Sequence, residues 1–108
     1  MSYQKNNIPA KFTITNHQKE CLIRAEKAQA NRDWRAAEFE YRKLVADKIK
    51  LPQVYSQLAL ICAMSNRINE ARELWNFALK LSPNFIGALM GLGDICKYER
   101  NFSKAVDD

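Results

Sequence analysis

The chain has 108 residues, of which 47% are hydrophobic and 27% charged, a composition typical of a folded domain and not of a fibre or a disordered region. Its net charge of +5 comes from 17 basic and 12 acidic residues that are interleaved without a dense cluster of one sign. This pattern favours a solvated surface over a nucleic-acid footprint. No apolar run approaches the length of a membrane span or a secretory signal, so we expect a cytoplasmic protein.

The first predicted elements are a leader and a helical hairpin. Residues 1–15 lack helical periodicity and contain Pro9, so we expect them to be extended. A helix is predicted from residue 16 to about residue 31, because Thr15 and Gln18 have the spacing of a capping box. A second helix follows a short break, with Asp33 as its cap, and continues to about residue 47.

Four more helices are predicted in the rest of the chain. Pro52 suits the first turn of a third helix, which ends near residue 65. A fourth helix is expected from about residue 68 and has to end before Pro83. A fifth covers about 85–99, and a short sixth begins at Phe102. The sequence therefore predicts an all-α protein built from helical hairpins.

A 34-residue period relates these hairpins. Ala37, Ala71 and Ala105 follow one another at this period, each three positions after a large apolar residue. Small residues that recur at this spacing suit places where two helices of a hairpin approach closely. The aligned blocks are 18–51, 52–85 and 86–108, and their first helices share three columns: Cys21, Tyr55 and Leu89; Ala25, Ala59 and Gly93; Ala28, Cys62 and Cys96.

Eight residues of the middle block carry a family resemblance: Tyr55, Leu58, Ala59, Cys62, Ala71, Trp75, Ala78 and Pro83. They fall in order on the signature columns of the tetratricopeptide repeat family, which this chain resembles over about 91 of its 108 residues. The third block matches in part, and the first departs from the signature, as terminal repeats commonly do. The departures are Arg24, Leu44 and Ile49.

The resemblance implies tandem antiparallel helical hairpins that form a right-handed α-solenoid over residues 16–108. The first helix of each repeat would line a concave groove, and such a groove suits a peptide or a helix of a partner protein. We therefore expect a non-catalytic interaction scaffold. The residues nominated for the groove are Leu22, Ile23, Glu26, Ser56, Gln57, Leu60, Met64, Met90, Asp94, Lys97 and Tyr98.

Two features narrow the expected partners. Family members that dock chaperone tails hold a terminal carboxylate with Lys, Asn and Arg side chains, and that set is missing here: the corresponding positions hold Leu22, Glu26, Gln57, Gly87 and Gly91. The third block stops after 23 of 34 positions, so we expect a piece of a longer protein, with self-association through its uncovered end. Membranes and nucleic acids are disfavoured as partners.

No constellation of residues predicts catalysis, a cofactor or a metal site. His17 is the single histidine, and no Cys or Ser has an expected base beside it. The three glycines fall inside a helical segment, where they make no phosphate-binding loop. Three cysteines without paired spacing are expected to be reduced, packed thiols.

Two alternatives stay open. Residues 70–79 also resemble the second helix of the half-a-tetratricopeptide repeats of RNA-processing assemblies, although Ala63 and Met64 stand where those repeats usually place a buried Glu. The chain could instead be a non-catalytic appendage of a transferase. A strong salt dependence of binding would favour the RNA-associated alternative.

Overall fold

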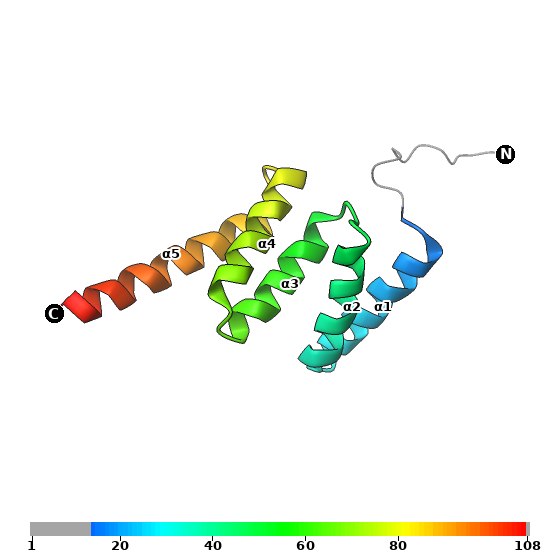
Figure 1. Ribbon diagram of the computed structural model, residues 1–108, viewed down its shortest axis with the longest axis horizontal. Helices are drawn as coiled ribbons and strands as arrows, with labels where there is room; N and C mark the ends of the chain where they lie inside the picture. The colour runs from blue at the N-terminus through cyan, green and yellow to red at the C-terminus, as the bar shows by residue number, and fades with distance from the viewer. Residues whose placement is uncertain (1–13, 108) are drawn as a thin grey trace. The chain divides into compact units, whose positions relative to one another are not determined.

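The computed structural model describes the backbone of residues 14–107 and the side chains of residues 14–100, and all regular secondary structure in this range is helical. Five helices follow one another along the chain (Figure 1). They belong to two compact units, residues 1–51 and residues 52–108, which are described one at a time. The predicted all-α fold class is confirmed, and the predicted leader lies outside the described residues except for its last two positions.

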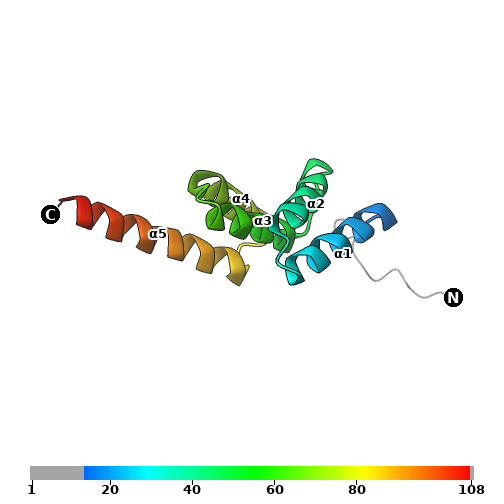
Figure 2. The same ribbon diagram turned by 90° about the horizontal axis from the view of Figure 1, so that it is seen from below.

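The first unit is an antiparallel pair of helices, α1 (Asn16–Ala30) and α2 (Trp34–Ala46) (Figure 2). At their interface the Tyr41 hydroxyl donates a hydrogen bond to Gln29 Oε1 at 2.7 Å. The rest of the core is apolar, and small residues alternate with larger ones as close helix packing requires. The buried residues of the two helices are Cys21, Ala25, Ala37, Tyr41 and Leu44.

Side-chain caps begin both helices of this unit, as the sequence predicts. Thr15 Oγ1 accepts a hydrogen bond from the Gln18 N–H, and the Gln18 side chain accepts one from the Thr15 N–H, both at 3.0 Å. Asp33 caps α2 by accepting from the Ala36 N–H at 3.2 Å. Local hydrogen bonding therefore fixes where these helices start.

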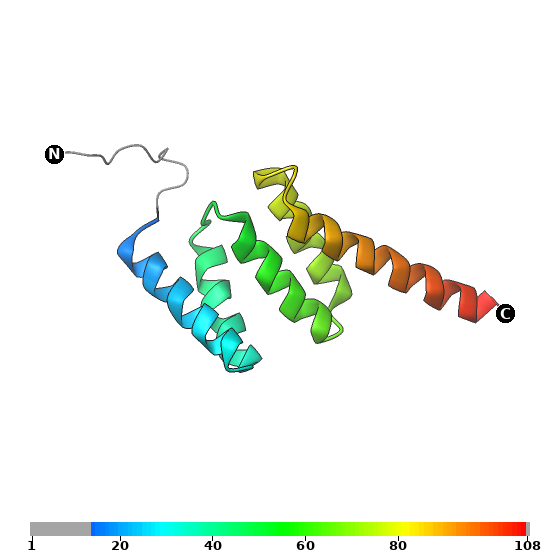
Figure 3. The same cartoon turned by 180° about the vertical axis from the view of Figure 1, so that it is seen from behind.

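The second unit contains α3 (Pro52–Met64), α4 (Ile68–Leu81) and α5 (Ile86–Asp107), and α3 contacts both other helices (Figure 3). α3 carries no charged residue and supplies most of the core. The Tyr55 ring packs on Phe77 of α4 with a centroid distance of 4.6 Å. The apolar core residues of α3 and α4 are Val54, Tyr55, Leu58, Ala59, Ile61, Cys62, Ala71, Trp75 and Ala78.

Two inter-helix turns, separated by one period of the repeat, have the same geometry. α1 is followed by Arg32, whose φ of 62° is left-handed, and the Asp33 N–H donates to the Ala28 carbonyl at 2.8 Å. α3 is followed by Asn66 with φ of 64°, and the equivalent backbone bond is also 2.8 Å long. Both are Schellman turns, which satisfy the carbonyl groups at a helix end.

The predicted break between a fifth and a sixth helix is wrong, because α5 continues from residue 86 to residue 107. Arg100 stands one period after Asn66, yet it lies inside the helix. No glycine or proline occurs between residues 94 and 107, so nothing local interrupts the backbone hydrogen bonds. Without a breaker, a helix that is already nucleated extends.

α5 packs with a different face from the one that the repeat predicts. Its buried positions are Ala88, Gly91 and Ile95, whereas Gly93 and Cys96 are exposed. A Cβ added at Gly93 would have no atom within 4 Å, so Gly93 marks no close approach of two helices. The expectations of a closely packed Gly93 and a packed Cys96 thiol are therefore wrong.

Candidate functional site

Two hollows on the second unit adjoin each other, and we call them together the α3–α5 groove. Their volumes are about 250 and 260 Å³, and they share Leu60, Trp75, Gly91 and Asp94. All three helices of the unit contribute to the walls, so a bound segment would contact elements from both sides of a hairpin turn. The remaining lining residues are Ser56, Gln57, Gly87 and Met90 in one hollow, and Ala63, Asn66, Ile68, Ile95 and Tyr98 in the other.

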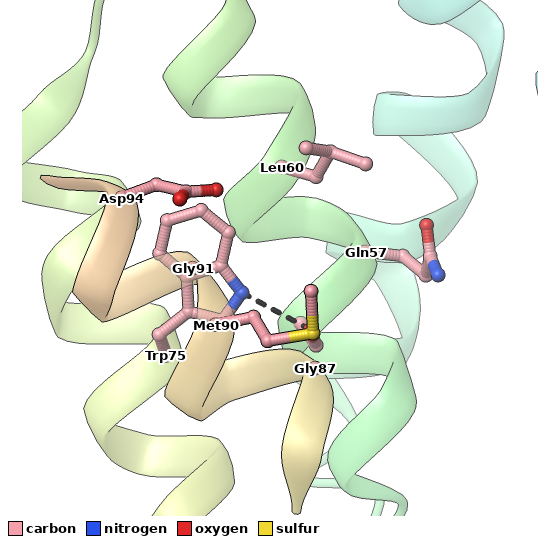
Figure 4. A pocket seen from close by; sticks show the side chains of 8 residues that line it. Gln57, Leu60, Trp75, Gly87, Met90, Gly91 and Asp94 are labelled. Atoms are coloured by element: carbon pink, nitrogen blue, oxygen red, sulfur yellow. Dashed lines mark hydrogen bonds between the residues drawn. The ribbon is translucent and has the colours of Figure 1, made fainter.

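The indole of Trp75 forms the floor of the groove. Only 4% of Trp75 is exposed, and its Nε1–H donates to Ser56 Oγ at 3.0 Å (Figure 4). Because the one polar atom of the ring is satisfied inside the protein, the ring edge at the groove is apolar. Ser56 is itself buried, so its hydroxyl holds the indole in place.

Gly91 lets α5 lie directly on this indole. A Cβ built at Gly91 would overlap the Trp75 ring well inside contact distance. One turn earlier, a Cβ at Gly87 would come within 3.1 Å of Ser56 Oγ. Absence of a side chain at Gly91 therefore brings the helix close enough to form the wall of the groove.

Exposed apolar side chains surround the floor. Leu60, Met90 and Tyr98 are 41%, 64% and 55% exposed. Among the described residues that line the groove, Asp94 is the only charged one. Figure 4 shows its carboxylate beside the indole of Trp75, with which it shares both hollows. The groove thus combines an apolar floor and rim with one negative charge.

Most of the groove residues predicted on α3 and α5 are brought together by the structure: Ser56, Gln57, Leu60, Met90, Asp94 and Tyr98. Met64 and Lys97 are exposed but line neither hollow. The other predicted residues belong to α1 in the first unit, where Ile23 and Glu26 are exposed and Leu22 is half-buried.

Trp75 is the main lining residue that the sequence prediction missed. It comes from α4, the second helix of its hairpin, and its column was assigned to packing alone. A signal was present in Gly91, because an isolated glycine inside a helix commonly marks a close backbone approach. Gly91 lies one period after Gln57, so it stands on the groove side of the repeat.

The first unit contains a thiol with polar neighbours. Cys21 Sγ lies 3.8 Å from His17 Nε2 and 3.3 Å from Arg24 Nη2, so the expectation that no cysteine has a base beside it is wrong for this residue. Cys21 is 1% exposed, however, which keeps the thiol away from solvent and from any dissolved reactant.

An ion-pair network on the first unit joins α1 to α2. Glu40 Oε2 lies 3.2 Å from Arg24 Nε, and its Oε1 lies 3.0 Å from Lys43 Nζ. Burial alone would raise the pKa of Glu40, but hydrogen bonds from Lys43 and Arg24 more than offset this, so its pKa lies below the usual value. One period after Arg24 and Glu40 stand Leu58 and Leu74, so the second unit has no equivalent pair.

For two tyrosines, burial raises the pKa of the side chain, in contrast to the lowered pKa of Glu40. It raises the pKa of Tyr41 to about 12, with a smaller contribution from the charge of Glu26. Burial also raises the pKa of Tyr55. Both hydroxyls therefore stay protonated at neutral pH and serve in packing and hydrogen bonding.

Among the side chains that the structure describes, those of residues 14–100, no group of His, Cys, Asp and Glu is placed to hold a metal ion. None of the described helices has both the length and the apolar character needed to cross a bilayer. Comparison of the chain with models of protein families, with curated proteins and with solved structures gives no match.

Proposed function

We propose that this chain is a tetratricopeptide-like repeat module that binds a peptide or a helix of another protein in the α3–α5 groove. The observation that carries the proposal is the groove itself, in which Leu60, Met90 and Tyr98 stay exposed around a buried indole. Exposed apolar side chains gathered around a hollow are a common mark of an interaction site. Such a surface suits an apolar anchor side chain of a partner.

The repeat architecture in this proposal has support from paired positions. The left-handed turn residues Arg32 and Asn66 are separated by one period. Buried residues recur at the same spacing. In most of the equivalent pairs, a small residue in one repeat corresponds to a small residue in the next, and a large residue corresponds to a large one. These pairs are Cys21 and Tyr55, Ala25 and Ala59, Ala37 and Ala71, and Tyr41 and Trp75. Stacking of such hairpins would give the right-handed solenoid.

The lining residues also limit the partner. Gln57, Gly87 and Gly91 occupy positions at which chaperone-docking tetratricopeptide repeats carry Lys, Asn or Arg, and none of the three can bind a terminal carboxylate as an ion pair. A phosphate backbone would meet the same lack of cations among the described lining residues. A protein segment that does not rely on a terminal carboxylate is therefore a better occupant than a chaperone tail or an RNA strand.

Affinity capture tests the proposal. A Leu60→Glu, Met90→Glu double variant places two charges on the groove rim, and we expect it to lose a protein that the wild type captures from a cell lysate. The matched control is Phe39→Glu, Ile86→Glu, since both residues are highly exposed but line no part of the groove. Quantitative mass spectrometry compares the captured proteins.

Loss from the groove variant alone supports the proposal. Equal capture by the groove variant and the wild type would contradict it. Circular dichroism of each variant verifies that the helices are intact, and this is expected because all four substituted side chains are exposed.

A further inference from the structure

The charge of the α3–α5 groove comes from Asp94. Its carboxylate forms no hydrogen bond or ion pair with another described side chain. α3 contributes no charge, because the segment Pro52–Met64 contains no Asp, Glu, Lys or Arg. The surface on which a partner would lie is therefore negative at one point and neutral elsewhere.

Two arginines of the second unit are engaged with acids other than Asp94. Arg72 of α4 pairs with Glu99 of α5, and Arg67 lies 3.9 Å from Glu70. Lys97 stands three residues after Asp94 on α5, but no ion pair joins the two. Asp94 is thus left to a ligand, whereas Glu70 and Glu99 have partners within the protein.

The surroundings of the carboxylate determine which cation fits. Both hollows are lined by Trp75, Leu60 and Gly91 together with Asp94. The part of a ligand side chain that leads to a charged group at Asp94 would therefore lie on an aromatic and aliphatic surface. Lysine and arginine side chains have that form, a long apolar stem with a charged end. An aromatic ring beside the carboxylate adds attraction for a cation.

Resting on the proposed function, we infer that the groove selects peptide segments in which a lysine or an arginine adjoins a large apolar residue. The cation pairs with Asp94, and the apolar side chain occupies the neighbouring hollow between Leu60 and Met90. Charge thus sets which apolar segments bind, since an acidic segment would bring two carboxylates together in a partly desolvated groove.

Peptide display tests the inference directly. A library of random dodecapeptides is selected on the purified 108-residue chain as the wild type, Asp94→Asn and Asp94→Lys. Glu73→Lys is the matched control, because Glu73 is an exposed acid of α4 that lines neither hollow. We expect the wild type and the control to enrich Lys or Arg next to Leu, Met or Phe, and Asp94→Lys to enrich Asp or Glu instead.

A selected peptide then gives the pairwise contribution. In the wild type, replacing its basic residue by Gln should weaken binding roughly fivefold, as measured by fluorescence anisotropy of the labelled peptide. In Asp94→Asn the same replacement should have no effect, because the two changes remove one interaction. The fold is expected to survive, since Asp94 is exposed and Asn has nearly the same shape.

The outcomes separate the two proposals. Peptides that lack basic residues, or a basic preference that persists in Asp94→Lys, would overturn this inference and leave the groove function standing. If every peptide selected by the wild type is also selected by the Leu60→Glu, Met90→Glu variant, the groove function fails, and this inference fails with it.

Discussion

Gly91 and Gly93 lie two residues apart on α5 and meet different surroundings. Gly91 touches the Trp75 indole, whereas a side chain at Gly93 would enter open space. Both glycines lower the intrinsic stability of the helix, but only at Gly91 does the structure show a contact that requires one. The pair therefore separates helix propensity from packing within one turn.

Alanine at the two positions should have opposite effects. Gly91→Ala is expected to destabilise the protein by about 1–2 kcal/mol, because the overlap with Trp75 outweighs the gain in helix propensity. Gly93→Ala should stabilise it by up to about 1 kcal/mol, since it gains propensity without a clash. Thermal unfolding followed by circular dichroism measures both. A shift of both variants in the same direction would show that the indole moves aside freely.

The three cysteines should differ in reactivity towards a thiol reagent. Cys96 is exposed, whereas Cys21 and Cys62 are buried. In the native protein we expect rapid modification at Cys96 alone, with the other two reacting only after unfolding in denaturant. Mass spectrometry of peptides from protein treated with iodoacetamide identifies the modified sites. Fast native labelling of Cys62 would mean that α3 and α4 open readily.

Glu40 should make the stability of the first unit dependent on pH. Its pKa is lower in the folded protein than its usual value, so its charged form stabilises the fold above the usual pKa, and this contribution is lost as the pH falls through the folded pKa. Glu40→Gln is therefore expected to be less stable than the wild type at pH 7. The difference should shrink in acid, below the usual glutamate range. Urea unfolding at several pH values provides the measurement, and a difference that does not change with pH would contradict this role.

At the scale of the elements, local signals predicted the starts and stops of helices well. Thr15, Asp33, Pro52 and Pro83 act through hydrogen bonds or backbone geometry within a few residues, and each marks a helix end close to the predicted position. The break predicted near residue 100 from the repeat was wrong. The turns at Arg32 and Asn66 contain no glycine or proline, so no sequence pattern could show whether a third such turn would form one period later. Packing of the flanking helices offsets the cost of a left-handed residue there.

A third left-handed turn, at Lys48, offers a way to make the protein more stable. Lys48 follows α2 with a φ of 58°, and it precedes the buried Ile49, whose N–H donates to the Leu44 carbonyl at 3.2 Å. Lys48→Gly should remove the strain of a side chain in this region and stabilise the protein by about 1 kcal/mol.

A glycine in a regular helix serves as the control for Lys48→Gly. Arg35→Gly lies in the first turn of α2, on an exposed position, and should destabilise the protein by up to about 1 kcal/mol. Thermal unfolding compares the two variants. If Lys48→Gly also lowered the melting temperature, the lysine would have to contribute a contact that outweighs the backbone strain.

At the scale of the whole molecule, the sequence predicted groove residues on α3 and α5, where the structure has the two hollows, but it did not predict their floor. Residues on α3 and α5 were found because aligning the chain on itself at the repeat period places equivalent faces in register. Trp75 was missed because an aligned column cannot tell a side chain that is wholly internal from one that shows an edge to solvent. The packing face of α5 was also misplaced, since Ala88, Gly91 and Ile95 are buried where Leu89, Gly93 and Cys96 were expected.

Because α5 packs with a different face from the predicted one, two of its apolar side chains are exposed outside the groove. Ile86 and Leu89 are 67% and 49% exposed. We expect weak self-association through them, seen as a concentration-dependent sedimentation coefficient in analytical ultracentrifugation. Leu89→Lys should shift the protein towards the monomer by exposing a charge, whereas Phe39→Lys on the first unit should not. A monomer at every concentration would contradict this expectation.

The buried indole under the groove has an optical consequence. The chain contains two tryptophans, and Trp34 lies in the other unit. Trp34→Phe would leave Trp75 as the single tryptophan fluorophore, at the floor of the surface that a ligand would cover. Seating of an apolar side chain would exclude water from the exposed edge of that ring and shift its emission to shorter wavelengths. The molecule thus carries its own unlabelled sensor of groove occupancy.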